Sequence, residues 1–210
     1  MTNQTTKIYG LFPTPVYIAK RDSDLIPREE KEIEKIIQEG MQKNTGNSSS
    51  INSYIFNENL KELKQFCEQQ IRIYVKDIIN PKKGLDFYIT QSWLNVTKPG
   101  EFHHEHCHSN SLISGVFYIS NIENDKITLM DPNSKIKEQI HVSPKTFTPF
   151  NSTCWFFPVH QSELILFPSW LSHKVERNEN ATTDRISISF NTFVKGTLGN
   201  IDESTELILK

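Results

Sequence analysis

Hydrophobic residues in the first eighty positions recur at helical spacing in two places. Apolar residues lie three or four positions apart between Ile33 and Met41, after a proline and a run of acidic residues. This pattern predicts an amphipathic helix from about residue 27 to 42, with Asp24 as its N-cap. The same spacing continues over roughly residues 58 to 79 and predicts a second amphipathic helix.

The segments around the first helix have a different character. Residues 8–19 carry β-branched and aromatic residues broken by two prolines, which predicts a kinked edge strand. Residues 44–53, NTGNSSSINS, are polar and predict a loop. We therefore expect a helical N-terminal part at about residues 20–80.

From residue 85 onward, short runs of β-branched and aromatic residues alternate with turn residues. The runs are DFYITQSWLNV, SLISGVFYIS, KITLM, KEQIHV, CWFFPV, ELILFP and RISISFNTFV. Short strands at this spacing, preceded by two helices, predict a mainly β protein with N-terminal helices. The expected architecture is a double-stranded β-helix, which is a cupin-like jelly-roll barrel, with its core at about residues 85–197 of a single domain, 1–210.

Composition narrows the classes of partner. The formal net charge of −2, with a pI near 6.4, gives no basic surface for nucleic acid. Three cysteines without a CxxC pair favour a reducing compartment. No apolar run is long enough for a signal peptide or a membrane span. We expect a cytoplasmic protein without nucleic-acid or membrane partners, and a homodimer is compatible with the sequence.

Histidines provide the strongest chemical signal. Four of the seven lie in the segment EFHHEHCHSN, between His103 and His108. An exposed loop that collected histidines without function is the alternative. His104, Glu105, His106 and His108 also satisfy HExxH, the zinc-protease signature, which requires a helix. Pro99 and Gly100 upstream and the β-type run downstream predict extended structure instead, so we do not expect a zinc protease.

On a strand, side chains two positions apart share a face. His104, His106 and His108 would then lie on one face, with His103 and Glu105 on the other. A metal held by this strand needs a further ligand from another one, and His173, after ELILFPSWLS, is the candidate. Imidazole ligands suit iron, zinc, copper or nickel. The alternative for His173 is a polar residue that ends a strand.

Arg185 begins the last predicted strand, where it alternates with Ser187 and Ser189. These three side chains can therefore face the barrel interior together. Arginine binds carboxylates in a planar, bidentate manner. A dicarboxylate that also chelates a metal, such as 2-oxoglutarate, would bridge Arg185 and that metal. The alternative is a surface ion pair of Arg185 with Asp184 or Glu176.

The stretch from Ser92 to Asn191 resembles the 2-oxoglutarate/Fe(II)-dependent oxygenases, in particular a group of small phage and bacterial proteins. The pieces that carry the resemblance are QSWLNVTKPG, HCHSNSLISGVFYI, ITLMDP, LILFPSWLSHKV and RISISFN, with LFPTPVY near the start. The resemblance implies Fe(II), 2-oxoglutarate and dioxygen as cofactor and cosubstrates. It assigns His106, His108 and His173 as metal ligands, Arg185 and Ser187 as the 2-oxoglutarate clamp, and Tyr118 and Asn95 as further cosubstrate or substrate contacts.

The sequence departs from this superfamily at His108, where a carboxylate normally completes two histidines and one acid. An all-histidine site leaves bound Fe(II) more positive by one charge. His103 with Glu105 preserves the His-x-acid spacing, but both would point away from His106. This region also resembles the cupins through Gly100 and the pair His106 and His108, although the glutamate of the cupin motif is missing.

The main hypothesis is an Fe(II)- and 2-oxoglutarate-dependent dioxygenase that hydroxylates an unidentified small molecule or side chain. The alternatives are a cupin-like metalloenzyme that does not use 2-oxoglutarate and a non-catalytic jelly-roll binding module. Loops at residues 43–56 and 131–155 are expected to line or cover the pocket. Trp93 and Trp170 lie in apolar runs and are expected in the core.

Overall fold

The computed structural model describes residues 6–82, 84–137, 139–140 and 142–210. The helical elements are α1 (Pro27–Glu39), η1 (Ile55–Asn57), α2 (Lys61–Tyr74), η2 (Val75–Ile79), α3 (Ser134–Lys137) and η3 (Ile201–Glu203). The strands are β1 (Tyr17–Lys20), β2 (Met41–Lys43), β3 (Ser48–Ser50), β4 (Asp86–Thr97), β5 (His103–His106), β6 (Ile113–Ser120), β7 (Lys126–Met130), β8 (Cys154–Pro158), β9 (Glu163–Pro168), β10 (His173–Val175), β11 (Arg185–Leu198) and β12 (Leu207–Leu209).

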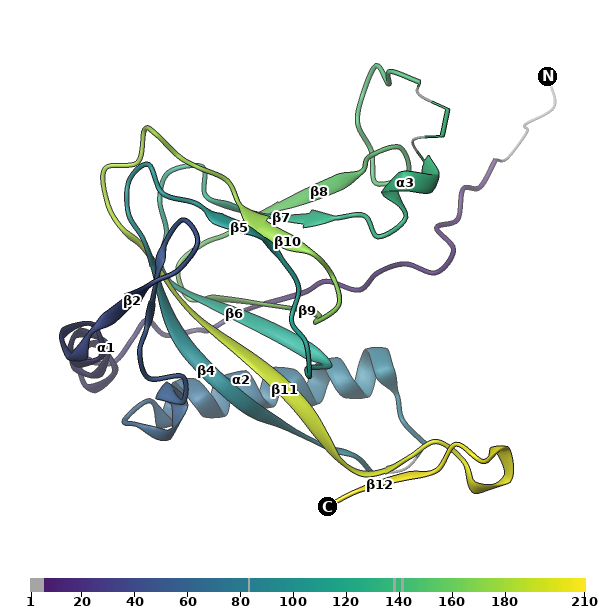
Figure 1. Ribbon diagram of the computed structural model, residues 1–210, viewed down its shortest axis with the longest axis horizontal. Coiled ribbons are helices and arrows are strands. Elements are labelled where there is room, and N and C mark those ends of the chain that lie inside the picture. The colour runs from purple at the N-terminus through teal and green to yellow at the C-terminus, as the bar shows by residue number, and fades with distance from the viewer. Residues whose placement is uncertain (1–5, 83, 138, 141) are drawn as a thin grey trace.

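These strands form two antiparallel sheets that face each other (Figure 1). The large sheet has the order β1-β9-β6-β11-β4-β3-β2, with β12 added to β11. The small sheet has the order β5-β10-β7-β8. Strands that are distant in sequence are neighbours in both sheets, as in a double-stranded β-helix, so the predicted fold class is confirmed.

Two hydrophobic clusters hold the layers together. One lies between the large sheet and the helices, where Leu63 and Ile71 of α2 share a cluster with Ile188 and Phe190 of β11. Figure 1 shows α2 extended across the large sheet. The second cluster lies between the two sheets and includes residues such as Ile127. Since successive residues of a strand face opposite sides, β11 packs its apolar residues on the helices and keeps its polar residues for the barrel interior.

The predicted helices are present but shorter than expected. The first ends at Glu39, and the second becomes π-helical after Tyr74. Asp24 does not cap α1, because it accepts a hydrogen bond from the Ser162 hydroxyl (3.0 Å). Glu29 performs the capping instead and accepts from the Ile26 backbone N–H (3.1 Å).

The predicted strands differ from the observed ones mainly where the local pattern was weak. The edge strand is confined to β1, since residues 8–16 are not a strand. The predicted loop at residues 44–53 contains β3, whose serines pair with β4. The predicted strand KEQIHV is wrong where it can be compared: Lys137 ends α3, no strand is assigned to the other described residues of the run, and residues 138 and 141 lie outside the described part. No helix in the described part of the chain has the length and apolar character needed to cross a membrane.

Gly115 in β6 provides a test of the packing between sheet and helices. A Cβ at this position would lie 2.2 Å from the ring of Phe190, which itself packs on Phe56. We expect Gly115→Ala to lower the free energy of unfolding by about 1–3 kcal/mol through overpacking, measured by urea denaturation. Gly84→Ala is the matched control, because a Cβ there meets no atom within 4 Å. Equal stability of the two variants would contradict this account of the core.

Candidate functional site

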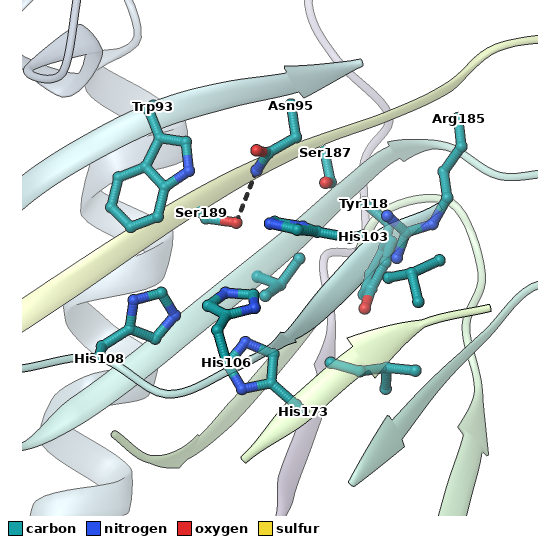
Figure 2. A pocket seen from close by; sticks show the side chains of 13 residues that line it. Trp93, Asn95, His103, His106, His108, Tyr118, His173, Arg185, Ser187 and Ser189 are labelled. Atoms are coloured by element: carbon teal, nitrogen blue, oxygen red, sulfur yellow. Dashed lines mark hydrogen bonds between the residues drawn. The ribbon is translucent and has the colours of Figure 1, made fainter. Parts of the chain in front are cut away.

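His106 and His173 lie side by side on adjacent strands of the small sheet. They are direct partners in the pairing of β5 with β10, and their ring centroids lie 4.3 Å apart (Figure 2). The Nδ1 atom of His106 lies 2.8 Å from the His104 carbonyl oxygen, and that of His173 lies 3.0 Å from the Leu171 carbonyl oxygen. A carbonyl only accepts, so each Nδ1 carries the proton and each Nε2 has a free lone pair. This arrangement is typical of metal-binding histidines.

His108 joins this pair from the loop that follows β5. Its backbone N–H donates to the Ser169 carbonyl (2.9 Å), which fixes the loop beside the end of β9. Its ring centroid lies 5.0 Å from that of His106 and 5.2 Å from that of His173. The potential ligand atoms of the three side chains all lie within 4.8 Å of one another. The structure thus brings together the three histidines that the sequence analysis selected.

The expected alternation of faces along this segment is wrong. His103 and not His104 lines the pocket with His106, His108 and His173, and the rings of His103 and His106 stack at 4.5 Å. The register between β5 and β10 shifts between His173 and Val175, so simple alternation fails.

The alternative ligand Glu105 is exposed and accepts a hydrogen bond from Ser172 (2.9 Å). In the part of the chain that the structure describes, Glu105 belongs to neither of the two residue groups suited to a metal, and both groups contain only histidines.

Burial keeps these imidazoles neutral. Burial, and to a smaller extent the neighbouring histidines, lower the pKa of His103 to about 3, that of His108 to about 4 and that of His173 to about 3. The pKa of His106 is also lowered, again mainly by burial. Neutral rings with free lone pairs are the form that binds a metal ion.

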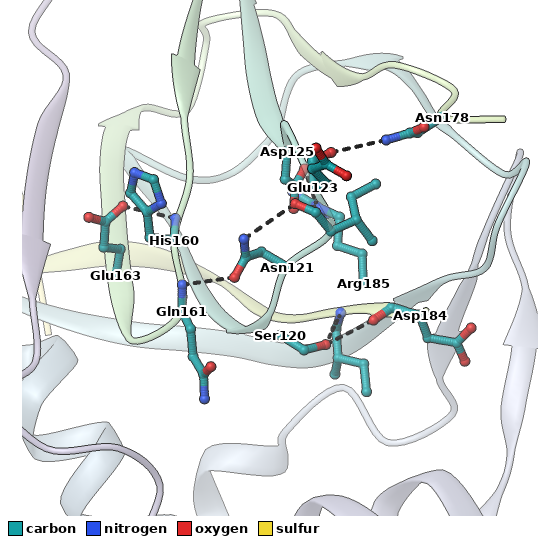
Figure 3. Close-up of polar contacts among 12 residues, drawn as sticks. Ser120, Asn121, Glu123, Asp125, His160, Gln161, Glu163, Asn178, Asp184 and Arg185 are labelled. Atoms are coloured by element: carbon teal, nitrogen blue, oxygen red, sulfur yellow. Dashed lines mark hydrogen bonds and ion pairs between the residues drawn. The ribbon is translucent and has the colours of Figure 1, made fainter. Parts of the chain in front are cut away.

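Arg185 closes the opposite end of the same pocket. It is 3% exposed, and its Nε donates to both carboxylate oxygens of Asp125, at 3.1 and 2.9 Å (Figure 3). The expected alternative partners, Asp184 and Glu176, are therefore not its partners. Both hydrogen bonds to Asp125 are made by Nε, so the two terminal nitrogens of the guanidinium can contact a ligand in the pocket.

Asp125 was not recognised from the sequence, because an acidic residue just before a strand carries no distinctive signal. It is 6% exposed, and burial raises the pKa of its carboxyl group while the Arg185 guanidinium opposes that shift. The two charges are buried together, and each compensates the other. Asp125 thereby holds the Arg185 side chain in place.

Polar side chains of three neighbouring strands form the wall between Arg185 and the histidines. Ser187 lies opposite Asn95 on one side and Tyr118 on the other. The Asn95 amide donates to Ser189 (2.9 Å), whereas Asn95 Oδ1 and Tyr118 Oη are buried without a hydrogen-bond partner among the described residues. Buried polar atoms of this kind normally have a partner, so both are suited to a polar ligand.

The expectation for the two tryptophans is wrong. Trp93 is half-buried and lines the pocket, with its ring 5.8 Å from that of His108. Trp170 is 56% exposed. Residues 43–56 and 131–155 were expected to line or cover the pocket, but none of their described residues is among those that line it. The Asn44 amide nitrogen lies 3.3 Å from Nε2 of His103, which does line it.

The depressed pKa values predict how the stability of the metal-free protein depends on pH. His173 stays neutral when folded but takes up a proton near pH 6.5 in the unfolded chain. The unfolded state then binds more protons, so the free energy of unfolding falls as the pH drops below 6.5, by up to about 1.4 kcal/mol per pH unit for this residue. We expect His173→Ala to reduce the slope measured by urea denaturation between pH 7 and 5. His160→Ala, which replaces an exposed histidine, is the control. An unchanged slope in His173→Ala would contradict the prediction.

Residues 91–191 match a family model described as "Putative 2OG-Fe(II) oxygenase". No curated protein sequence matches the chain. Solved structures share the fold at low sequence identity. One is an oxidoreductase of the 2OG-Fe(II) oxygenase family from Burkholderia pseudomallei, with 9% identity, a TM-score of 0.55, and coverage of 84% of this chain and 83% of that one.

A Pseudomonas putida prolyl-4-hydroxylase has 14% identity and a TM-score of 0.53, covering 85% of this chain and 92% of that one. HygX from Streptomyces hygroscopicus, with nickel, 2-oxoglutarate and hygromycin B bound, has 10% identity and a TM-score of 0.54, covering 85% and 82%. The solved structures support the fold, and the family model supports the activity class. The match over residues 91–191, slightly less than half of the chain, and the shared fold indicate a 2OG-Fe(II) oxygenase, an oxidoreductase.

Proposed function

We propose that this oxygenase binds Fe(II) through His106, His108 and His173, binds 2-oxoglutarate between that metal and Arg185, and hydroxylates a small molecule or a side chain. One observation carries the assignment. A group of three imidazoles with ligand atoms within 4.8 Å of one another and a buried arginine line the same pocket. When bound, Fe(II) and 2-oxoglutarate supply the chemistry that activates dioxygen.

The histidines fit a divalent metal. His106 and His173 present Nε2 because their Nδ1 protons are held by backbone carbonyls. Three protein ligands leave positions for cosubstrates on an octahedral ion. Three neutral ligands also leave the full metal charge uncompensated, which favours an anionic ligand such as a 2-oxo acid.

The other end of the pocket fits a carboxylate. Arg185 offers its terminal nitrogens, and its guanidinium carbon lies 5.0 Å from the centre of the Tyr118 ring. The unpartnered Tyr118 hydroxyl and the neighbouring Ser187 can donate hydrogen bonds to the same group. The apolar side chains Val116 and Ile127 line the pocket beside them and limit the access of water.

Titration of the Fe(II)-loaded protein with 2-oxoglutarate under argon tests this proposal. We expect the weak visible charge-transfer band of the metal-chelated 2-oxo acid in the wild type. His173→Ala should lose it, and Arg185→Ala should need about 10–100 times more 2-oxoglutarate, since charge-assisted hydrogen bonds contribute about 1.5–3 kcal/mol. Arg72→Ala, an exposed arginine on α2, is the matched control.

A folded, metal-loaded wild type without the band would contradict the proposal. It would favour the cupin-like alternative, a metalloenzyme that does not use 2-oxoglutarate. Equal affinity for 2-oxoglutarate in Arg185→Ala and Arg72→Ala would remove Arg185 from the site.

Asp125→Asn tests whether Asp125 positions Arg185. The substitution leaves a buried guanidinium without its counter-ion, so the free energy of unfolding without ligand should fall by about 3–5 kcal/mol. Added 2-oxoglutarate restores a negative partner, so it should raise the melting temperature more in the variant than in the wild type. An equal shift in both proteins would limit Asp125 to a structural role.

The cellular setting is part of the same proposal. The three cysteines, Cys67, Cys107 and Cys154, are free thiols, which supports a reducing cytoplasmic environment. The net charge of −2 supports a substrate other than nucleic acid. A homodimer stays a prediction.

A further inference from the structure

A second group of three histidines overlaps the proposed iron site. His103, His104 and His106 also have potential ligand atoms within 4.8 Å of one another. The ring centroids of His103 and His104 lie 5.3 Å apart, and those of His104 and His106 lie 4.9 Å apart. Nitrogens around a tetrahedral ion, at about 2.1 Å from it, are about 3.4 Å apart, so modest rotations of the side chains would close the group around an ion.

The two groups face different spaces. His106, His108 and His173 line the pocket inside the barrel, which we call the inner pocket. His103 and His104 line a second, more open pocket together with Phe102, Lys174 and Arg177, which we call the outer pocket. His103 lines both. An ion that arrives through the outer pocket therefore meets His103 and His104 before it reaches His173, which is 5% exposed.

The turn between β2 and β3 contacts the rings of His103 and His104 and thereby fixes which nitrogen of each carries the proton. His104 Nδ1 lies 3.3 Å from the Thr45 carbonyl oxygen, and a carbonyl only accepts, so Nε2 of His104 has the free lone pair. His103 Nε2 faces the Asn44 amide nitrogen at 3.3 Å, and an amide nitrogen only donates. The lone pair of His103 Nε2 thus already meets a donor that a metal ion can replace.

The two cationic side chains that line the outer pocket are each paired with a carboxylate. Lys174 pairs with Glu176 at 2.8 Å, and Arg177 pairs with Glu179 at 3.7 Å. Each positive side chain near His104 is thereby compensated by a carboxylate. An imidazole-preferring ion such as Zn(II), Co(II) or Ni(II) suits a group of this composition.

We propose that His103, His104 and His106 form a second divalent-metal site, the outer site, and that it excludes occupation of the inner site. Both need His106, and His106 has one free nitrogen because its Nδ1 donates to the His104 carbonyl. The chain then holds one ion at a time and passes it inward by exchanging ligands around His106. The outer site stands on its own geometry, whereas the exclusion rests on the proposed iron site.

Anaerobic Co(II) titration of the full-length protein tests this, with visible d–d absorption and metal analysis of the desalted protein as readouts. The inner-deficient variant is His108→Ala with His173→Ala, and the outer-deficient variant is His103→Ala with His104→Ala. We expect each of them, and the wild type, to bind one ion per chain, with different spectra for the two variants. Adding His104→Ala to the inner-deficient variant should weaken binding at least about tenfold, and adding His160→Ala instead should not.

The possible failures are distinguishable. A folded inner-deficient variant that binds no Co(II) overturns the outer site and leaves the proposed iron site intact. Two ions per wild-type chain overturn the mutual exclusion. An outer-deficient variant that binds none, beside an inner-deficient variant that binds one, supports the outer site and contradicts the proposed iron site. Circular dichroism of each variant reports whether it is folded.

Discussion

The pairing of β5 with β10 is the contact on which the site depends. It places His106 directly opposite His173, although their segments are far apart in the chain. Neither strand is long, so their alignment is stabilised by the rest of the small sheet, where β10 also pairs with β7. The backbone carbonyls of His104 and Leu171 then select the tautomer of each ring. The same hydrogen-bonded sheet that builds the barrel thereby prepares two ligands for a metal.

Burial has opposite consequences at the two ends of the inner pocket. At the histidine end it lowers the pKa values and keeps the rings neutral, which suits metal binding. At the other end burial holds the Arg185 guanidinium and the Asp125 carboxylate together as an ion pair, with Nε 2.9 Å from Oδ2. The pocket therefore offers neutral ligands for a cation and hydrogen-bond donors for a carboxylate. A bridging dicarboxylate satisfies both requirements at once.

The crowding of histidines in β5 links the two proposals. His103 stacks on His106 and also borders the outer pocket, so the inner site is not isolated from solvent by an apolar wall on this side. If both sites bind metal, they compete for His106, so only one of them is occupied at a time. Ligand exchange around a shared residue would then control loading of the enzyme, separately from the chemistry that the loaded site performs.

Local pattern was sufficient for much of the fold. Short runs of β-branched and aromatic residues bounded by turn residues identified β4, β6, β7, β8, β9 and β11, because such side chains pack well on the pleated surface of a sheet. Helical spacing identified α1 and α2 for the corresponding reason. Short strands such as β3 and β10 were missed, since they are held by pairing with neighbours and carry little hydrophobic pattern of their own.

The sequence by itself determined the chemical inventory of the site. Clustered histidines, an arginine beside alternating serines, and the runs that build a barrel can all be recognised from residue types and spacing. Only the tertiary structure decided that His103 turns toward His106, that Asp125 is the partner of Arg185, and that Trp93 reaches the pocket. Those relations depend on cross-strand register and on a local irregularity in β5, and neither is encoded in the periodicity of a single strand.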